Sequence, residues 1–290
     1  MSAKLLMGKP IADKINEQIK KDLAELKEKH GIVPSLASVL VGDDPASKSY
    51  SGRQKKNAGA IGIEYELHEI SEDTSEGKLL DFIMELNQDR SVNGIIVQMP
   101  LPKGIDEHKV QSTIAMEKDV EGITPTNMGL IVYDRPRLCP CTALSAVKII
   151  ESVGADIYGK NLTVVGRSAI VGKPVALLML QRKYSSTVTI CHTGTAKVGT
   201  LPEHVGNADI LVVAAGSPEL VKGEWIKEGS IVIDVGFNVV NGKTVGDVEF
   251  EVAKEKAGYI SPVPGGVGPL TVAILLQNTV EATKWQLENS

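Results

Sequence analysis

Several features are scarce in this 290-residue chain, and each scarcity narrows the class of protein. Aromatic residues make up only 4% of it, so aliphatic side chains and alanine must fill the interior, as is typical of a parallel sheet covered by helices. Positive charge is not in surplus, because 31 Lys and Arg are outnumbered by 36 Asp and Glu. The resulting net charge of -5 argues against nucleic acid or an anionic membrane as a partner.

Long hydrophobic runs are also missing. No apolar stretch approaches the ~20 residues that span a bilayer, and the N-terminus lacks the apolar segment of a signal peptide. These two absences predict a cytoplasmic protein.

Metal-binding patterns are missing as well. Of the three cysteines, Cys139 and Cys141 form a C-x-C pair, which is too short for a zinc half-site, and Cys191 stands alone. The five histidines are scattered along the chain. We therefore expect inert, reduced thiols and no metal.

The most informative stretch runs from residue 161 to residue 180. Residues 161–165 read as a buried strand, Gly166 to Lys173 as a glycine turn, and Pro174 to Leu180 as a helix. Such a turn lets backbone N–H groups approach a phosphate near a helix N-terminus. The fingerprint G-x-G-x-x-G is absent, however, so the local pattern fits a phosphate cradle and an ordinary strand-to-helix turn about equally.

Strands and helices alternate along the rest of the chain. The first half predicts a helix over 10–29 and strands over 36–41, 64–70 and 94–97, and the second half predicts strands over 187–191, 209–213 and 230–235. This order is typical of βαβ units. The length of the chain favours two domains, so we predict an α/β protein with two α/β domains, the second one a parallel sheet.

Two polar positions stand where a ligand or a structural role is possible. The predicted helix over 46–61 carries Tyr50, Gln54, Ala58 and Ile61 at steps of four, four and three residues, which fits either a solvated helix docked by small residues or one wall of a cleft. Gln98 follows the strand 94–97, at the strand end where ligands bind in open α/β sheets. A glutamine there can equally cap backbone groups.

Other segments carry weaker expectations. Thr142 is predicted to cap a helix that ends before Gly154, and residues 118–127 are expected to form a polar crossover. Residues 261–269, rich in proline and glycine, can approach a ligand closely. The apolar helix over 270–280 is expected to pack against the first domain.

Seven motifs in one order resemble those of the methylenetetrahydrofolate dehydrogenase/cyclohydrolase family, and the likeness covers essentially the whole chain. They are Pro45-Ala46-Ser47 with Tyr50, Val97-Gln98-Met99-Pro100-Leu101-Pro102, Lys118-Asp119-Val120-Glu121-Gly122, Pro140-Cys141-Thr142, Gly166-Arg167-Ser168 with Val171-Gly172-Lys173-Pro174, Asp234-Val235-Gly236, and Pro262-Val263-Pro264-Gly265-Gly266-Val267-Gly268-Pro269.

The resemblance implies a folate-binding catalytic domain over residues 1–140 and 266–290, and a Rossmann-like NAD(P)-binding domain over 141–265, with a cleft between them. It implies that Tyr50 stacks on the folate, that Gln98 supports the reacting end and that Glu121 holds the pterin. It also implies a homodimer through the nucleotide-binding domains. Further folate contacts implied are Lys56, Pro264 and Gly265, and coenzyme contacts implied are Gly166, Arg167, Ser168, Thr193 and Phe237.

Gln54 is the main departure from the family, whose pattern has a lysine four residues after the tyrosine. Oxidation of the methylene bridge needs no proton removal by the enzyme, whereas hydrolysis of the methenyl group does, and a glutamine amide cannot accept a proton at neutral pH. We expect a dehydrogenase with cyclohydrolase activity lost or weak, served by a separate cyclohydrolase. The alternative is a bifunctional dehydrogenase/cyclohydrolase in which another group or solvent moves the proton.

Two further departures affect binding. Glu121 stands where the family has aspartate, which keeps the charge and adds one methylene. His192-Thr193-Gly194 stands where the family often has a cation after the strand 187–191, so NADP and NAD stay open; Arg167 and the Thr193 hydroxyl can still serve a 2′-phosphate.

Two rival functions remain open at this level. An amino-acid or hydroxy-acid dehydrogenase of similar form would need a histidine or lysine base at a strand end, and none stands out. A non-catalytic sensor that binds nucleotide or folate would fit the missing lysine.

Overall fold

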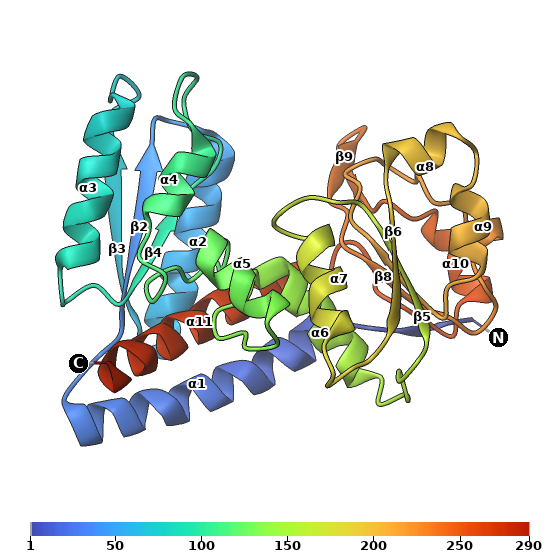
Figure 1. Ribbon diagram of the computed structural model, residues 1–290, viewed down its shortest axis with the longest axis horizontal. Coiled ribbons are helices and arrows are strands. Elements are labelled where there is room, and N and C mark those ends of the chain that lie inside the picture. The colour runs from blue at the N-terminus through green and yellow to red at the C-terminus, as the bar shows by residue number, and fades with distance from the viewer. Residues whose placement is uncertain (1, 290) are drawn as a thin grey trace. The chain divides into compact units, whose positions relative to one another are not determined.

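The computed structural model describes residues 2–289, which form two compact units (Figure 1). The small-sheet unit, built on a three-stranded sheet, takes residues 14–130, 135–139 and 272–289. The large-sheet unit, built on a six-stranded sheet, takes residues 2–13, 131–134 and 140–271.

The sheet of the small-sheet unit is parallel, with β2 (Ser35–Val41) between β3 (Glu64–Ile70) and β4 (Gly94–Val97). These strands confirm the predicted α/β pattern at nearly the predicted bounds. Because side chains alternate along a strand, β2 presents a different set of residues to each face. Its apolar run is buried on both, as is typical of a parallel strand.

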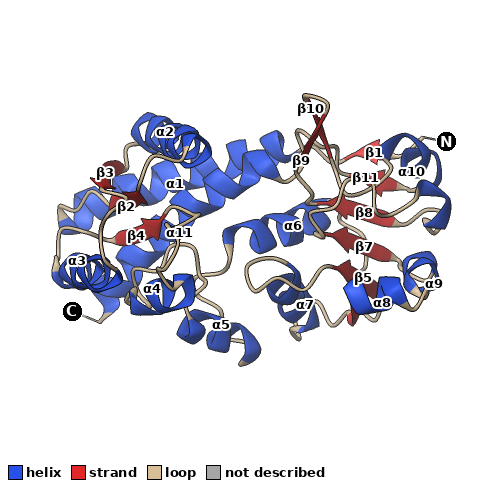
Figure 2. Cartoon of the chain, turned by 90° about the horizontal axis from the view of Figure 1, so that it is seen from above, coloured by secondary structure: helices blue, strands red, loops and turns tan. Residues whose placement is uncertain are grey.

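Helices cover both faces of this sheet. Ala37 and Val39 of β2 pack in one core with α3 (Glu76–Gln88) and α4 (Glu107–Thr113). The alternate face, which carries Ser38, lies under α2 (Pro45–Ile61), and Figures 1 and 2 show α2 and α3 on opposite sides of the strands. This second face therefore brings polar side chains of the sheet against a helix.

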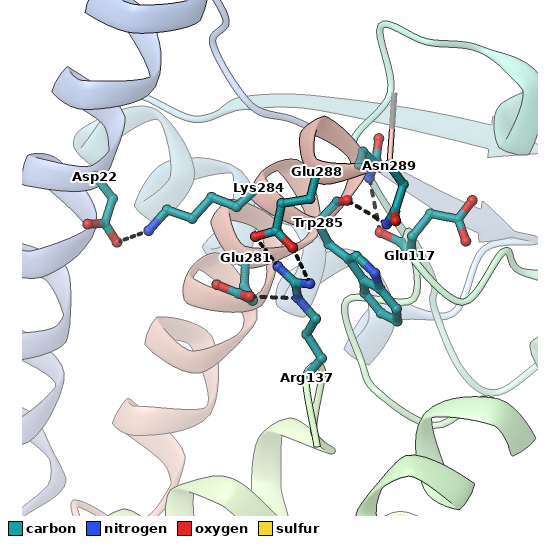
Figure 3. A network of polar contacts seen from close by, with 9 residues as sticks. Asp22, Glu117, Arg137, Glu281, Lys284, Trp285, Glu288 and Asn289 are labelled. Atoms are coloured by element: carbon teal, nitrogen blue, oxygen red, sulfur yellow. Dashed lines mark hydrogen bonds and ion pairs between the residues drawn. The ribbon is translucent and has the colours of Figure 1, made fainter. Parts of the chain in front are cut away.

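Two long helices complete the small-sheet unit, α1 (Gly8–His30) and α11 (Gly268–Glu288). Arg137 fixes the end of α11: its guanidinium forms hydrogen bonds of 2.9 Å to Glu281 and 2.6 and 2.7 Å to Glu288, and it stacks 5.2 Å from the ring centre of Trp285 (Figure 3). Asn278 donates to the carbonyl oxygens of Val120 and Cys139. The last helix thus packs in the small-sheet unit over most of its length, as expected.

The six strands of the large sheet are all parallel, in the order β1-β11-β8-β7-β5-β6. The chain order reverses at β5, which pairs with β6 on one side and β7 on the other. In open α/β sheets, ligands bind at the carboxyl ends of the strands that flank such a reversal. The bounds are β1 (Lys4–Leu5), β5 (Asn161–Val165), β6 (Thr187–Cys191), β7 (Ile210–Val213), β8 (Ile231–Asp234) and β11 (Tyr259–Ile260).

Helices also cover both faces of the large sheet, as Figure 2 shows. The core on one face joins strand residues to α9 and α10 and includes Val165, Leu211 and Ala253. α6 and α7 lie against the other face. The bounds are α6 (Cys141–Ser152), α7 (Gly172–Leu180), α8 (Thr193–Lys197), α9 (Leu201–Gly206), η1 (Gly223–Trp225) and α10 (Phe250–Lys256), and β9 (Asn238–Val240) pairs antiparallel with β10 (Lys243–Val245).

Two local expectations need correction. Thr142 is not a cap, because α6 begins at Cys141 with Pro140 in the cap position and no side-chain cap bond. The predicted polar crossover over 118–127 runs into α5 (Pro125–Val132), a helix that was not predicted and whose first turn is capped by the Thr124 hydroxyl accepting from Asn127 N at 3.3 Å. A Thr-Pro pair at the start of an apolar run was the overlooked signal.

The division into units also differs from the predicted boundaries. Residues 2–13 belong to the large-sheet unit, because β1 pairs in parallel with β11. The boundary in the last segment falls after Thr271 and not before residue 266, since the segment through the first turn of α11 stays with the large sheet. Among residues 2–289, no helix is both long and apolar enough to cross a bilayer.

Candidate functional site

The position of α2 is set at its two ends. Asp44 caps its first turn by accepting from Ser47 N at 2.8 Å, Pro45 begins the helix, and Gly62 ends it in the left-handed conformation with φ 102°. The Ser47 hydroxyl lies 2.7 Å from Met99 O, which ties the helix to the segment after β4. The buried face is Ser47, Ser51, Gln54 and Ala58, so small residues dock this helix on the sheet.

A network of side chains joins α2 to one face of the small sheet. Gln54 Oε1 accepts from Tyr65 Oη and from Gln98 Nε2, both at 2.9 Å, and Gln98 Nε2 also donates to Ser38 Oγ at 2.9 Å. Tyr65 pairs across the sheet with Leu36, two residues before Ser38, so both side chains lie on the same face. We call Ser38, Gln54, Tyr65 and Gln98 the amide network.

The two amides of the network are buried, and Tyr65 is half-buried. Gln54 is 0% exposed and Gln98 3% exposed, and Gln54 Nε2 has no hydrogen-bond partner among residues 2–289. Burial raises the pKa of Tyr65 to about 12, although a hydrogen bond with Ser38 lowers it somewhat, so the phenol stays protonated at neutral pH. Gln54 Oε1 already serves two donors, and Nε2 can only donate. Position 54 therefore holds a fixed amide and no base.

Two other predicted folate contacts lie on α2. Tyr50 is half-buried and stands one turn before Gln54, on the same side of the helix. Lys56 is exposed. At about 200° from Gln54 around the helix axis, it does not lie with the amide network.

The loop that carries Glu121 is held by its neighbours. Lys118 Nζ donates to Asp89 O at 2.6 Å and Leu86 O at 3.0 Å, and buried Asp119 accepts from Thr124 N and Asn127 Nδ2, both at 2.8 Å. Glu121 itself is partly exposed. Burial of its carboxyl group, with repulsion from Asp119, raises the pKa of Glu121 to about 8, so this group is mostly protonated at pH 7.

The glycine turn after β5 has the predicted strand–turn–helix form. Gly166 adopts φ 126°, and a side chain there would collide with the carbonyl oxygen of Ala214. A side chain at Gly172 would collide with the carbonyl oxygen of Gly166. The Ser168 hydroxyl accepts from Val171 N at 3.2 Å and from Gly172 N at 3.3 Å. Arg167 and Ser168 are exposed.

The other predicted coenzyme contacts follow neighbouring strands. Thr193 is exposed at the start of α8, directly after β6, where His192 Nδ1 accepts from Gly194 N at 3.0 Å and His192 N donates to Thr195 Oγ1 at 3.2 Å. Phe237 follows β8 and is 71% exposed. Because the strands are parallel, these positions share the carboxyl edge of the large sheet with Gly166. Pro264 and Gly265 belong to the same unit.

Sequence reasoning missed the residue that shapes the loop after β7. Asp247 is fully buried, and its Oδ2 accepts from Ala215 N and Gly216 N at 2.6 and 2.8 Å, while its Oδ1 accepts from Ser217 N and Asn238 Nδ2, both at 2.9 Å. The sequence signal that could have indicated close packing here was Gly236, since a side chain at that position would collide with Asp247. The loop at the carboxyl end of β7 is therefore wrapped around a carboxylate of the protein.

Asp247→Asn should destabilise the protein. An amide keeps one acceptor oxygen and turns an NH₂ group toward donors that a carboxylate now satisfies. Leaving buried donors unpaired costs about 1–3 kcal/mol, so the free energy of unfolding in urea should fall by about that amount. Glu228→Gln, the same charge change at an exposed position of the same unit, should leave it unchanged. Equal stability of the two variants would show that the four contacts contribute little.

Within residues 2–289, no three His, Cys, Asp or Glu side chains gather as metal ligands would. The three cysteines are buried.

Comparison with known proteins connects these two units to one family. The catalytic-domain model of the tetrahydrofolate dehydrogenase/cyclohydrolase family matches residues 6–121, and its NAD(P)-binding-domain model matches residues 140–287. The bifunctional protein FolD of Moorella thermoacetica is 49% identical over 285 residues, which cover 98% of this chain and 100% of that protein.

Solved structures agree. The bifunctional FolD dehydrogenase/cyclohydrolase of Campylobacter jejuni has a TM-score of 0.93 and 40% identity, covering 98% of this chain and 100% of that one. The Trypanosoma brucei enzyme, solved with NADP and an inhibitor, has a TM-score of 0.91 and 35% identity, covering 99% of each chain. The NAD-dependent 5,10-methylenetetrahydrofolate dehydrogenase of Saccharomyces cerevisiae has a TM-score of 0.80 and 26% identity, covering 100% of each. These neighbours confirm the predicted fold class.

Proposed function

The chain belongs to the tetrahydrofolate dehydrogenase/cyclohydrolase family, and on that premise we propose that it oxidises 5,10-methylenetetrahydrofolate to 5,10-methenyltetrahydrofolate by hydride transfer to NAD(P)⁺. Removing hydride from the methylene carbon leaves a cation shared by two nitrogens, so the protein need not take a proton. The absence of a base at position 54 is compatible with this step.

The protein's own residues are assigned to binding and orientation. Tyr50 stacks on the folate, Gln98 supports its reacting end, and the Glu121 carboxylate accepts the two N–H donors of the pterin edge. Lys56 offers an exposed ammonium to the folate carboxylates, and the Pro264–Gly265 backbone supplies a further contact. Tyr50, Gln98 and Glu121 belong to one unit, which supports their acting together.

The turn at Gly166 fits a dinucleotide. Its two glycines leave the backbone bare where side chains would collide with carbonyl oxygens, and α7 begins directly after the turn. An oxidised nicotinamide held there would supply the hydride acceptor. Gly166 and Ser168 are proposed to hold the diphosphate, and Phe237 to cover a coenzyme ring.

We propose both coenzymes as candidates. Arg167 and Thr193 are exposed near the carboxyl edge of the sheet and can bind a 2′-phosphate, which favours NADP, and an NADP complex is known for the Trypanosoma brucei relative. The Saccharomyces cerevisiae relative is NAD-dependent, and residues 192–196, which follow β6, contain no Lys or Arg. Initial rates with each coenzyme decide between them.

We propose that cyclohydrolase activity is lost or weak, so that a separate cyclohydrolase consumes the product. The observation that carries this is the bonding of the Gln54 side chain: Oε1, its only acceptor atom, already receives two hydrogen bonds. General acid–base help is worth about 10²- to 10⁴-fold in rate, which is the loss expected. The alternative is a bifunctional enzyme, as the FolD relatives are named.

One assay tests the proposed activity against its rivals. Protein, methylenetetrahydrofolate and NADP⁺ or NAD⁺ are mixed, and the absorbance of reduced nicotinamide is followed. Turnover supports the dehydrogenase. Binding of folate and coenzyme without turnover would support a sensor, and turnover only with amino or hydroxy acids would support the other dehydrogenases.

We also propose a homodimer through the large-sheet unit. β6 is an edge strand of that sheet, and its Ile190 is 40% exposed, which leaves hydrogen-bonding groups and apolar surface for a second copy. Light scattering on the purified protein gives the mass that tests this.

A further inference from the structure

We infer that Tyr65 and Ser38 are positioning residues of the folate site, which fix the amide of Gln98 so that its carbonyl oxygen is the group presented to the folate. This inference rests on the proposed dehydrogenase function. It gives two residues outside the family motifs a defined part in the reaction.

Of the two amides, only Gln98 can be reached by a ligand. Gln54 has no exposed surface, whereas Gln98 keeps 3% and directly follows β4. Gln54 is therefore an internal support, and Gln98 is the amide that we assign to the substrate.

The NH₂ end of the Gln98 amide points inward. Nε2 donates to Ser38 Oγ and to Gln54 Oε1, each at 2.9 Å. Both N–H bonds are thereby used inside the protein. The carbonyl oxygen Oε1 is the part of the amide left to act on a ligand.

Tyr65 fixes the orientation of Gln54. Its hydroxyl donates to Gln54 Oε1 at 2.9 Å, which holds the oxygen of Gln54 toward the sheet and hence toward Gln98. Turning Gln54 over would point its NH₂ at the Gln98 NH₂ and force Gln98 to turn as well. A phenol that stays protonated to about pH 12 keeps this donor in place at any ordinary pH.

Hydride transfer favours this orientation of Gln98, with its carbonyl oxygen toward the folate. Hydride removal creates positive charge on the folate, and a carbonyl dipole aimed at developing charge stabilises a transition state. An NH₂ group in the same place would repel it. Tyr65 and Ser38 thus act on the rate of hydride transfer through Gln98, with little effect on folate binding.

The test is a double-mutant cycle on the full-length protein. Tyr65→Phe should lower kcat for coenzyme reduction by about 2- to 12-fold, the factor that corresponds to one neutral hydrogen bond, with KM for folate changed less than about twofold. In a Gln54→Ala background, Tyr65→Phe should have no further effect, because its route to Gln98 is gone. Tyr158→Phe, at a tyrosine that is 74% exposed in the other unit, is the matched control and should match the wild type.

Each outcome of the cycle supports or overturns the positioning role of Tyr65. Unchanged kcat in Tyr65→Phe, or an equal loss in both backgrounds, overturns the inference, because a purely structural tyrosine gives additive losses. If Tyr65→Phe does not fold, Ser38→Ala removes the contact at the other end of the network and should give the same loss of kcat. If the wild type itself shows no turnover, the proposed function fails, and the inference is judged by the side-chain NH₂ signals of Gln98 in ¹⁵N-labelled protein. These should shift in Tyr65→Phe, and unshifted signals refute the positioning.

Discussion

Gln54→Lys is expected to gain cyclohydrolase activity, with methenyltetrahydrofolate hydrolysed about 10²- to 10⁴-fold faster than by the wild type. The site suits an amine. Position 54 is fully buried, and burial lowers the pKa of a lysine, which brings the neutral, proton-accepting form within reach near pH 7. Tyr65 Oη and, after rotation, Gln98 Oε1 can both accept from the new ammonium group.

The measurement is the decay of methenyl absorbance with and without protein. Gln54→Met has similar length and no ionisable group, so it should show only the decay seen in buffer. Suppose that Gln54→Lys folds and oxidises the methylene compound, yet hydrolyses the methenyl compound no faster than Gln54→Met does. The cause of the missing hydrolysis would then lie elsewhere in the site. Rapid hydrolysis by the wild type would support the bifunctional alternative.

Glu121→Gln is expected to weaken folate binding by about 10- to 100-fold, since a charge-assisted hydrogen bond is worth about 1.5–3 kcal/mol. The carboxylate can accept both N–H donors of the pterin edge, whereas a glutamine amide offers one acceptor and one donor. The measurement is the dissociation constant for a folate analogue at fixed pH. Glu107→Gln, an exposed acid of the same unit, is the matched control, and similar affinities in the two variants would remove Glu121 from the site.

The same carboxyl group gives the sign of the pH dependence. Burial and Asp119 raise the pKa of Glu121 to about 8 in the ligand-free protein, so binding below that pH must first release a proton. Folate affinity should therefore rise with pH, by about tenfold per unit well below pH 8, and level off above it. In Glu121→Gln this dependence should be absent.

The fold was largely predictable from local patterns. The strands over 64–70, 94–97, 161–165 and 187–191 begin and end where the sequence predicted. The buried strands 94–97 and 161–165 are written as short apolar segments between turn residues, whereas the edge strand 64–70 shows alternating side chains. The place of residues 2–13 was not predictable. Only pairing of β1 with β11, more than 250 residues away, puts this segment in the large-sheet unit.

The site was predictable to the extent that its residues belong to motifs. Tyr50, Gln98, Glu121 and Gly166 stand in such motifs, but Tyr65 does not. Its contact with Gln54 depends on the register of β3 against β2, which places the phenol on the face under α2. Asp247 was missed for the same reason, because its four donors come from segments that precede it by up to 32 residues.

The central claim is that this chain forms the methenyl group and leaves it intact. One reaction tests it directly: methylenetetrahydrofolate and coenzyme are mixed with the protein, and reduced nicotinamide and methenyltetrahydrofolate are followed together. We predict that the two appear in equal amounts and that the methenyl compound then decays only as fast as in buffer. Reduced nicotinamide that accumulates while the methenyl compound does not would contradict the claim.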